Sequence, residues 1–308
     1  MSLYKYLTFE RMDILENAHI RFTQPSAFND PFETFPSFQA FAPIEEIEKY
    51  ANDHKWDENE TNKILEEAWQ NEMKKYPGVN ISFSLVKNQM GSVFEKSKPM
   101  IMEMFKKFMG MKGEFFKDMA TNTVMKALNS TIGILCLTEA PDNILMWSHY
   151  AKNHTGFIIE FDNSHDFFDQ RKKDHELRGH VKKVRYSKHR PKVTIYDPNL
   201  SKEENINIWI NDFFWVKSVD WKYEKEWRII YTLKECQKVI SYVEPPVCLF
   251  PLPLESIKSV IIGSRASKPN KEAMCQLLSS RKDLSHISLK AAILDKDEYK
   301  INIHNDSI

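Results

Sequence analysis

The stretch Ile134–Asp162, ILCLTEAPDNILMWSHYAKNHTGFIIEFD, decides the fold of this chain. It predicts a strand over Ile134–Leu137, an acidic turn, a polar and aromatic crossing segment, and a second strand over Phe157–Phe161. Two strands joined in this way are typical of a scaffold that holds reactive side chains at its edge. The alternative is a plain helix with a core face and ordinary surface histidines. The crossing segment carries Trp147, Ser148, His149, Tyr150 and His154.

Strand patterns on both sides of this stretch extend the predicted sheet. A further helix is expected over Phe9–Ala18, with Thr8 as a partial N-cap, and another over about Pro269–Ser280. Together they predict an α+β fold with a central mixed, mainly antiparallel sheet in one domain over residues 1–308. The other predicted strands are Leu3–Tyr6, Ile20–Phe22, Val181–Tyr186, Trp227–Thr232, Val260–Gly263, Ile287–Leu294 and Tyr299–Ile303.

Residues 43–130 have a different texture. Apolar residues recur there at spacings of three and four in a background rich in Lys, Glu and Met, which predicts amphipathic helices. We interpret this block as a helical insertion into the domain. Its Met-rich part, Met100–Met111, is either the core of the helices or an adaptable surface for a protein partner. Outside this block, another amphipathic helix, rich in aromatic residues, is expected over Ile206–Val216.

The composition is that of an ordinary globular protein. Hydrophobic residues make up 42% of the 308 residues and charged residues 28%, and 43 basic residues balance 43 acidic ones. The neutral balance gives no overall attraction to nucleic acid or membrane. The four cysteines show no zinc-ligand spacing, and no apolar run reaches 18 residues, so we expect free thiols, no metal site and a cytoplasmic location. Because only 8 residues are Gly, a Gly-rich phosphate loop is not expected.

Positive charge gathers locally between Arg171 and Lys192. This basic stretch holds ten Lys or Arg residues against two acidic ones. It is either a solvated surface or a contact for a nucleic acid, a protein acceptor or a phosphate-bearing ligand.

Two further segments carry candidate ligand contacts. The loop Gln24–Glu33 contains two prolines and two Phe residues, and it is either a structural turn pinned by Phe28 and Phe32 or a ligand-facing loop that offers Asn29, Asp30 and Glu33.

The second segment is Glu224-Lys225-Glu226, followed by Arg228. In an extended backbone its two carboxylates would point to one face, which suits general-base work or the stabilisation of a sugar cation. The alternative is a pair of surface salt bridges to Lys222, Lys225 and Arg228.

Three segments carry a resemblance to a known family. The opening LYKYLTFERMDILENAHIRFTQPSAFNDPFE, the central LCLTEAPDNILMWSHYAKNHTGFIIEFD and the late YEKEWRIIY together resemble the bacterial family called domain of unknown function 2971. That family label implies no activity.

A more distant resemblance is to the ADP-ribosyltransferase fold, which would make the sheet a split one. It implies NAD as a substrate, Glu226 as the catalytic acid assisted by Glu224, and a toxin-like or antiviral-defence effector. Tyr6 or Tyr150 would stack on nicotinamide, and Lys5 and Asn29 would contact ribose or phosphate. Lys5 stands where those enzymes carry His or Arg. The candidate catalytic residues are Glu226, Glu224, His149 and Tyr150, and the candidate NAD contacts are Lys5, Tyr6, Asn29, Asp30, Trp147, Ser148 and Arg228.

Two other classes of function stay open on the sequence. A nucleic-acid enzyme would use His149 and His154 as acid and base and the basic stretch Arg171–Lys192 for phosphates. A sensor without catalytic activity would bind its partner through the helical block 43–130.

Overall fold

The computed structural model describes most of the sheet region of the chain. The described residues are 2–34, 37–40, 125–171, 179–194 and 213–305, with 66–67, 70, 73–74, 82, 84, 122, 197, 199–201, 204, 208 and 211. The chain divides into two compact units, the first made of Met1–Ser37, Asn122–Val193 and Ile206–Ile308, the second of Phe38–Thr121 and Thr194–Asn205. The predicted helical block 43–130 lies outside the described residues, except for a few positions and a helical segment at 125–131.

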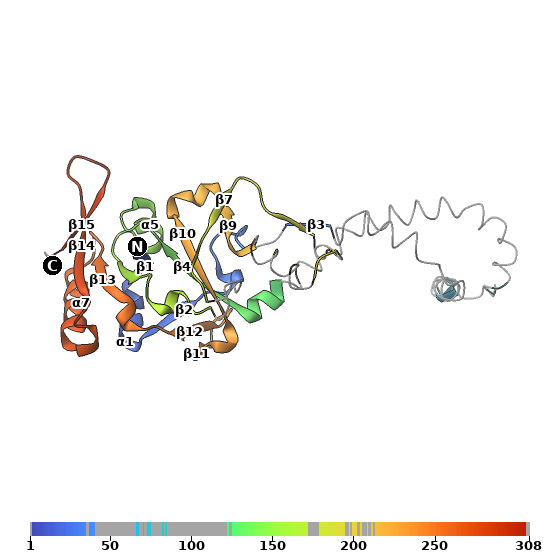
Figure 1. Ribbon diagram of the computed structural model, residues 1–308, viewed down its shortest axis with the longest axis horizontal. Helices are drawn as coiled ribbons and strands as arrows, with labels where there is room; N and C mark the ends of the chain where they lie inside the picture. Colours follow the sequence, from blue (N-terminus) through green and yellow to red (C-terminus); the bar gives the residue numbers. More distant parts are fainter. Residues whose placement is uncertain are drawn as a thin grey trace. The chain divides into compact units, whose positions relative to one another are not determined.

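The first unit is built on an eight-stranded sheet in the order β15-β14-β13-β5-β1-β4-β10-β6 (Figure 1). Every pair is antiparallel except β13–β14, which is parallel. Helix α7 (Lys268–Ser280) joins this pair, since parallel neighbours need a crossover connection. The prediction of an α+β fold with a mixed, mainly antiparallel sheet is confirmed. The strands are β1 (Ser2–Leu7), β4 (Ile132–Thr138), β5 (Phe157–Asp162), β6 (Lys182–Lys183), β10 (Glu226–Thr232), β13 (Ile257–Ile262), β14 (Ser288–Leu294) and β15 (Ile301–Asn305).

Smaller strands complete this part of the chain. Strands β11 (Lys238–Ile240), β12 (Val247–Pro251) and β2 (His19–Phe22) form a three-stranded antiparallel sheet. Strands β7 (Arg185–Ser187) and β9 (Val216–Ser218) form a parallel pair. Two short strands, β3 (Ser37–Ala40) and β8 (Lys192–Thr194), lie at the boundaries of the two units.

Both faces of the eight-stranded sheet are covered. One face packs Leu135 and Ile229 against α1 (Asp13–Asn17), α7 and the three-stranded sheet. The other packs Ile158 and Tyr6 against Trp147 of α5 (Ile144–Tyr150). Strands that are covered on both sides read as nearly continuous apolar runs, which explains why the runs in β4 and β5 were recognisable in the sequence.

Helix α5 and the turn after it place the central segment. Asn143 caps α5 by accepting a hydrogen bond from the Met146 backbone N–H at 3.0 Å. Lys152, Asn153 and His154 then all have positive φ angles, of 48°, 56° and 68°. The chain turns tightly into β5 at Gly156, where a Cβ atom would lie 2.1 Å from the Leu7 carbonyl oxygen. Only glycine fits there.

Two predicted elements differ from the structure, and a third lies largely outside the described residues. The expected helix Phe9–Ala18 is a 3₁₀ helix, Phe9–Arg11, followed by the short helix α1, and the Thr8 side chain makes no capping hydrogen bond. The expected strand Val181–Tyr186 is two strands, β6 and β7, in different sheets, because it bends at Val184. The expected helix Ile206–Val216 lies largely outside the described residues. Its described positions 208, 211, 213 and 214 are helical, whereas its last residue, Val216, begins strand β9.

Candidate functional site

Five charged side chains meet at one end of β10. Three are carboxylates and two are cations, and each is no more than 6% exposed. They come from the loop after β2, from β9, from the 3₁₀ helix η4 (Val219–Glu224) and from β10. We call this group the five-charge cluster: Glu33, Lys217, Glu224, Glu226 and Arg228.

Arg228 uses its whole guanidinium inside the cluster. Nε donates to Glu226 Oε1 at 2.6 Å and Nη2 donates to Glu226 Oε2 at 3.0 Å, which is a bidentate pair. Nη2 also pairs with Glu33, and Nη1 donates to the Phe214 carbonyl oxygen at 2.7 Å. The Phe28 ring lies 5.6 Å from the guanidinium carbon. Arg228 therefore holds the segment before β9 and the loop after β2 against β10.

Lys217 faces all three carboxylates. Its Nζ lies 2.7 Å from Glu224 Oε2, 2.9 Å from Glu226 Oε2 and 3.2 Å from Glu33 Oε2. The contacts to Glu224 and Glu226 are hydrogen bonds, whereas Glu33 Oε2 accepts no hydrogen bond. Glu33 is thus the carboxylate that the cluster satisfies least.

The two glutamates of the Glu-Lys-Glu motif converge by a route that the sequence prediction missed. Glu224 ends η4, Lys225 has a positive φ of 45°, and Glu226 is the first residue of β10. The extended backbone expected for this motif is therefore wrong. The left-handed residue turns the chain between the two glutamates, and Lys217 draws both carboxylates together. The alternative of surface salt bridges is wrong as well, since both side chains are buried.

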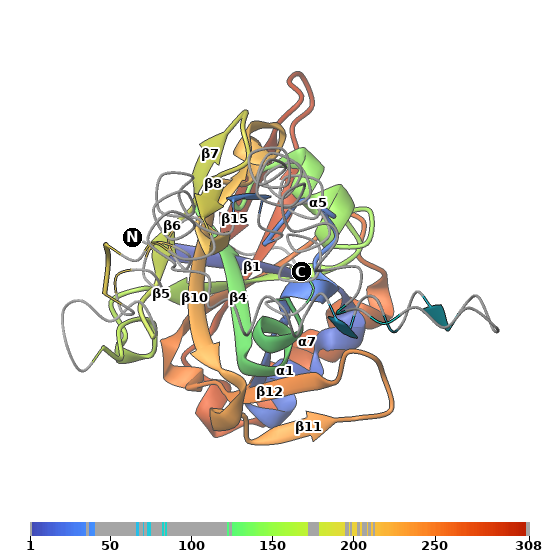
Figure 2. The ribbon, with the colours of Figure 1, turned by 90° about the vertical axis from the view of Figure 1, so that its right-hand side faces the viewer.

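Neighbouring polar groups fix the cluster from outside. The Tyr150 hydroxyl donates to Glu224 Oε1 at 2.6 Å, and Asn29 Nδ2 donates to that hydroxyl at 3.5 Å. The Tyr186 hydroxyl accepts from the Glu226 backbone N–H at 2.8 Å. Thr138 Oγ1 donates to the Glu224 carbonyl oxygen at 2.5 Å. Strands β4 and β10, side by side in Figure 2, bring Thr138 and Glu226 into register.

The charges and burial shift the pKa values of Glu226 and Glu33 in opposite directions. Burial acts to raise the pKa of Glu226, but Arg228 and Lys217 outweigh it and lower this pKa to about 2. Burial, reinforced by Glu226, raises the pKa of Glu33 in spite of Arg228 and Lys217. Burial acts to lower the pKa of Lys217, but the three carboxylates raise it. The cluster therefore favours the anion of Glu226 and disfavours the anion of Glu33, each relative to an ordinary glutamate.

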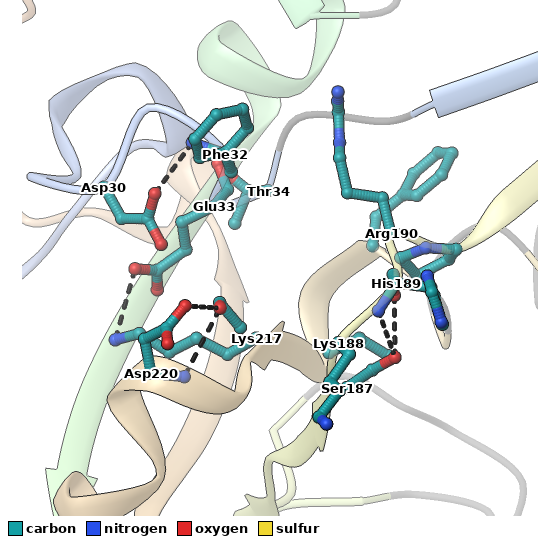
Figure 3. A pocket seen from close by; sticks show the side chains of 14 residues that line it. Asp30, Phe32, Glu33, Thr34, Ser187, Lys188, His189, Arg190, Lys217 and Asp220 are labelled. Carbon is teal, nitrogen blue, oxygen red and sulfur yellow. Dashed lines mark hydrogen bonds and ion pairs between the residues drawn. The ribbon is translucent and has the colours of Figure 1, made fainter.

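A pocket of about 290 Å³ opens beside the cluster (Figure 3). Asp30 and Glu33 lie on one side of it, in the loop after β2, and Lys217 and Asp220 lie at its base. The opposite side is the loop after β7. The pocket is lined by Asp30, Phe32, Glu33, Thr34, Ser187, Lys188, His189, Arg190, Pro191, Phe213, Val216, Lys217, Ser218 and Asp220.

Among the described residues of the basic stretch, those in its last part line this pocket. Earlier lysines make contacts inside the protein: Lys182 lies over the Trp215 ring at 5.0 Å, and Lys183 pairs with Glu139 at 2.8 Å. Lys188, His189 and Arg190 instead form one wall of the pocket. Lys188, His189 and Arg190 are therefore the described basic-stretch side chains that could meet a ligand in this pocket.

The other candidate residues of the crossing segment lie apart from the pocket lining. Trp147 is fully buried and donates to the Pro141 carbonyl oxygen at 2.8 Å. Ser148 Oγ lies 3.1 Å from His154 Nε2, and burial lowers the pKa of His154. His149 is exposed, and its ring contacts Tyr150.

The two candidates of β1 also lie outside the pocket lining. Lys5 donates to the Cys136 carbonyl oxygen at 2.9 Å, and burial lowers its pKa. The Tyr6 hydroxyl donates to the Ala140 carbonyl oxygen at 2.7 Å, and its ring meets Trp147 edge-on at 5.2 Å. Of the predicted site residues, the structure joins Glu224, Glu226, Arg228, Tyr150 and Asn29 to the cluster, and Asp30 to the pocket.

Lys217 was missed by the sequence analysis. It follows the aromatic run Phe213–Trp215 and begins no recognisable motif. Phe32 was also misjudged, because it is 63% exposed and does not pin the loop.

The described part of the chain shows neither a metal-binding cluster nor a membrane-spanning helix. No group of three or more metal-ligating side chains comes together there, and no helix is long and apolar enough to cross a bilayer. All four cysteines are free thiols. Cys248 is buried, while Cys136, Cys236 and Cys275 are half-buried.

Comparison with known proteins identifies one domain. Residues 146–229 match the family model described as "Protein of unknown function (DUF2971)". These residues form a DUF2971 family domain. The domain carries four members of the five-charge cluster, all except Glu33, and the basic wall of the pocket. No curated protein and no solved structure matches the chain, and the comparisons give no evidence for the expected resemblance to ADP-ribosyltransferases.

Proposed function

We propose that this protein is an enzyme that binds a phosphate-bearing small molecule in the pocket beside the five-charge cluster and uses Glu33 to move a proton. The observation that carries the proposal is the position of Glu33: a buried carboxyl with a raised pKa lines a pocket whose opposite wall is basic. A perturbed carboxyl in a pocket is a common sign of acid–base chemistry.

The two walls of the pocket suit two parts of a ligand. Lys188 and Arg190 offer charged donors for phosphate oxygens, and His189 adds a ring nitrogen. Asp30 and Asp220 offer carboxylate oxygens that accept hydrogen bonds from sugar hydroxyls. A phosphorylated sugar unit, with hydroxyls on one side and phosphate on the other, has this distribution of groups.

The reaction expected from the sequence, cleavage of NAD, fits this arrangement with one change of role. Glu33, as a carboxylate of raised pKa, accepts a proton from water or from another acceptor hydroxyl. The oxygen of that water or hydroxyl attacks C1′ of the ribose at the same time. The bond from C1′ to the nicotinamide nitrogen breaks, and nicotinamide leaves with the bonding electron pair. Glu226 is held as an anion by Arg228 and Lys217, so its role is to keep Lys217 and Glu33 in place. An ADP-ribosyltransferase type of sheet and a role as a defence effector are further parts of this proposal.

The test combines turnover with binding. The full chain is incubated with NAD, and released nicotinamide is measured for the wild type and for Glu33→Gln. We expect the substitution to lower the rate by about 10²-fold or more, which is the usual contribution of a positioned acid or base. The matched control is Glu160→Gln, which removes a mostly buried carboxylate of β5 away from the pocket and is expected to keep the wild-type rate.

The binding half uses ADP-ribose and inorganic phosphate in calorimetric titrations. We expect Lys188→Ala and Arg190→Ala to lower the affinity for both ligands and to reduce the dependence of binding on salt concentration. Absence of phosphate and ADP-ribose binding, or equal NAD turnover in wild type and Glu33→Gln, would contradict the proposed function.

A further inference from the structure

Phe32 stands out among the residues that line the pocket. Its side chain is 63% exposed, whereas Asp30, Glu33 and Thr34 around it in the loop are 3–6% exposed. The loop is well fixed: Asp30 Oδ1 accepts from the Phe32 backbone N–H at 2.9 Å, and the Asp30 carbonyl oxygen accepts from the Glu33 N–H at 3.1 Å. The exposed ring is therefore held in place by an ordered backbone at the pocket.

Arg190 approaches this ring from the opposite wall. Its guanidinium carbon lies 5.7 Å from the Phe32 ring centroid, within the range of a cation–π contact. Both residues line the pocket. An open aromatic ring beside a planar guanidinium offers stacking contacts to a flat ring, since aromatic and guanidinium planes are the usual partners of nucleobases in proteins.

The size of the pocket and its charges restrict the ligand further. A volume of about 290 Å³ lies just below the usual range for ligand pockets, about 300–1,000 Å³, so the enclosed part of a ligand is no larger than about one nucleotide unit. Lys188 and Arg190 belong to the wall of the pocket that we assign to phosphate. Asp30 and Asp220 can accept hydrogen bonds from ribose hydroxyls. A base, a ribose and a phosphate account for the aromatic, acidic and basic parts of the lining together.

We propose that the ligand is a nucleotide whose base stacks on Phe32 beside Arg190, so that Phe32 selects nucleotides over sugar phosphates. This inference rests on the proposed function for the existence of a phosphate-binding pocket and adds the residue that recognises the base of the nucleotide. Phe32 acts on specificity and takes no part in proton transfer. Because its side chain is exposed, substitution there removes little packing from the folded protein.

The test compares two ligands on three proteins. The full chain and its Phe32→Leu and Phe32→Trp variants are titrated calorimetrically with AMP and with ribose 5-phosphate. We expect Phe32→Leu to weaken AMP binding by about tenfold or more, within the range of base–aromatic stacking, and to leave ribose 5-phosphate within about twofold. Phe32→Trp keeps a stacking surface and is expected to retain AMP affinity.

Each outcome separates the two proposals. Unchanged AMP affinity in Phe32→Leu, or an equal loss for both ligands, overturns the stacking role and leaves the phosphate pocket standing. If neither ligand binds the wild type, the pocket does not hold phosphorylated sugars, and both proposals are overturned. A selective loss of AMP with retained ribose 5-phosphate binding supports both.

Discussion

One face of the eight-stranded sheet carries two ionic clusters of different composition. Cross-strand pairing places Ser259, Glu160, Tyr4, Thr138 and Glu226 in a single row across β13, β5, β1, β4 and β10. At the β10 end the row runs into the five-charge cluster. At the β13 end Glu160 accepts from Ser259 Oγ at 2.5 Å and pairs with Lys290 at 2.7 Å.

The difference lies in the balance of charge. The Glu160 group has one carboxylate and one cation, and the pKa of Glu160 is lowered because Lys290 and Ser259 outweigh burial. The five-charge cluster has three carboxylates and two cations, so one carboxylate is in excess. Burial raises the pKa of Glu33, and Glu33 lines the pocket. A matched pair stabilises a sheet, whereas an unmatched buried carboxyl beside a pocket is suited to chemistry.

The largest expected effect compares the cations of the two groups. Arg228→Met leaves Glu226 and Glu33 buried beside a single remaining cation, and we expect a loss of about 3–5 kcal/mol in the free energy of unfolding. Lys290→Met is expected to cost less, about 1–3 kcal/mol, because the Lys290 side chain is 23% exposed and Glu160 keeps its hydrogen bond from Ser259. Urea unfolding of both variants measures the two losses. Equal losses would remove the distinction between the groups.

The next effect concerns Glu226 in acid. Its pKa falls from the ordinary 4.5 to about 2 on folding, which corresponds to about 3 kcal/mol of stability. A depressed carboxyl pKa stabilises the fold above pH 4.5, and this contribution is lost as the pH falls towards 2. We therefore expect the stability of the wild type to fall more steeply than that of Glu226→Gln between pH 4.5 and 2.5. Parallel acid profiles from chemical denaturation would contradict the burial and pairing of Glu226.

A smaller loss of stability is expected from removing single hydrogen-bond donors, and it should be larger where the acceptor is charged than where it is neutral. Tyr150→Phe removes the donor to the buried Glu224 carboxylate, and we expect a loss of about 1.5–3 kcal/mol. The control is Tyr6→Phe, which removes a donor to the neutral Ala140 carbonyl and is expected to cost about 1 kcal/mol. Thermal and urea unfolding of the two variants give the comparison. A larger loss in Tyr6→Phe would show that Tyr150 adds nothing to the cluster.

The smallest effect on stability is expected at Glu33. A raised pKa means that the ionised carboxylate is less stable in the fold than in the unfolded chain. This penalty grows as the pH rises from about 4.5 through the raised pKa of Glu33 and is constant above that pKa. Glu33→Gln should therefore lie within about 1 kcal/mol of the wild type at pH 7, and its stability relative to the wild type should increase as the pH rises from about 4.5 and then level off. A relative stability that decreases over that range would place the excess charge on another carboxylate.

The sequence predicted the sheet better than the site. Runs such as Ile134–Leu137 and Phe157–Phe161 are apolar on both faces, so they form strands whatever their neighbours are. The split of Val181–Tyr186 and the short helix α1 depend on contacts with other segments, and local pattern does not contain them. The Glu224 and Glu226 pair was recognisable, but its left-handed turn and its cation were not.

The sequence by itself determined the α+β class, most strands of the large sheet and the carboxylate pair at the start of β10, because these follow from local periodicity and residue type. Only the tertiary structure decided that Glu33, Lys217 and Arg228 join that pair, and that the last part of the basic stretch faces Glu33 across a pocket. Glu33 lies 184 residues from Lys217 along the chain. Pairing over such separations depends on how β2, β9 and β10 pack, which no local pattern encodes.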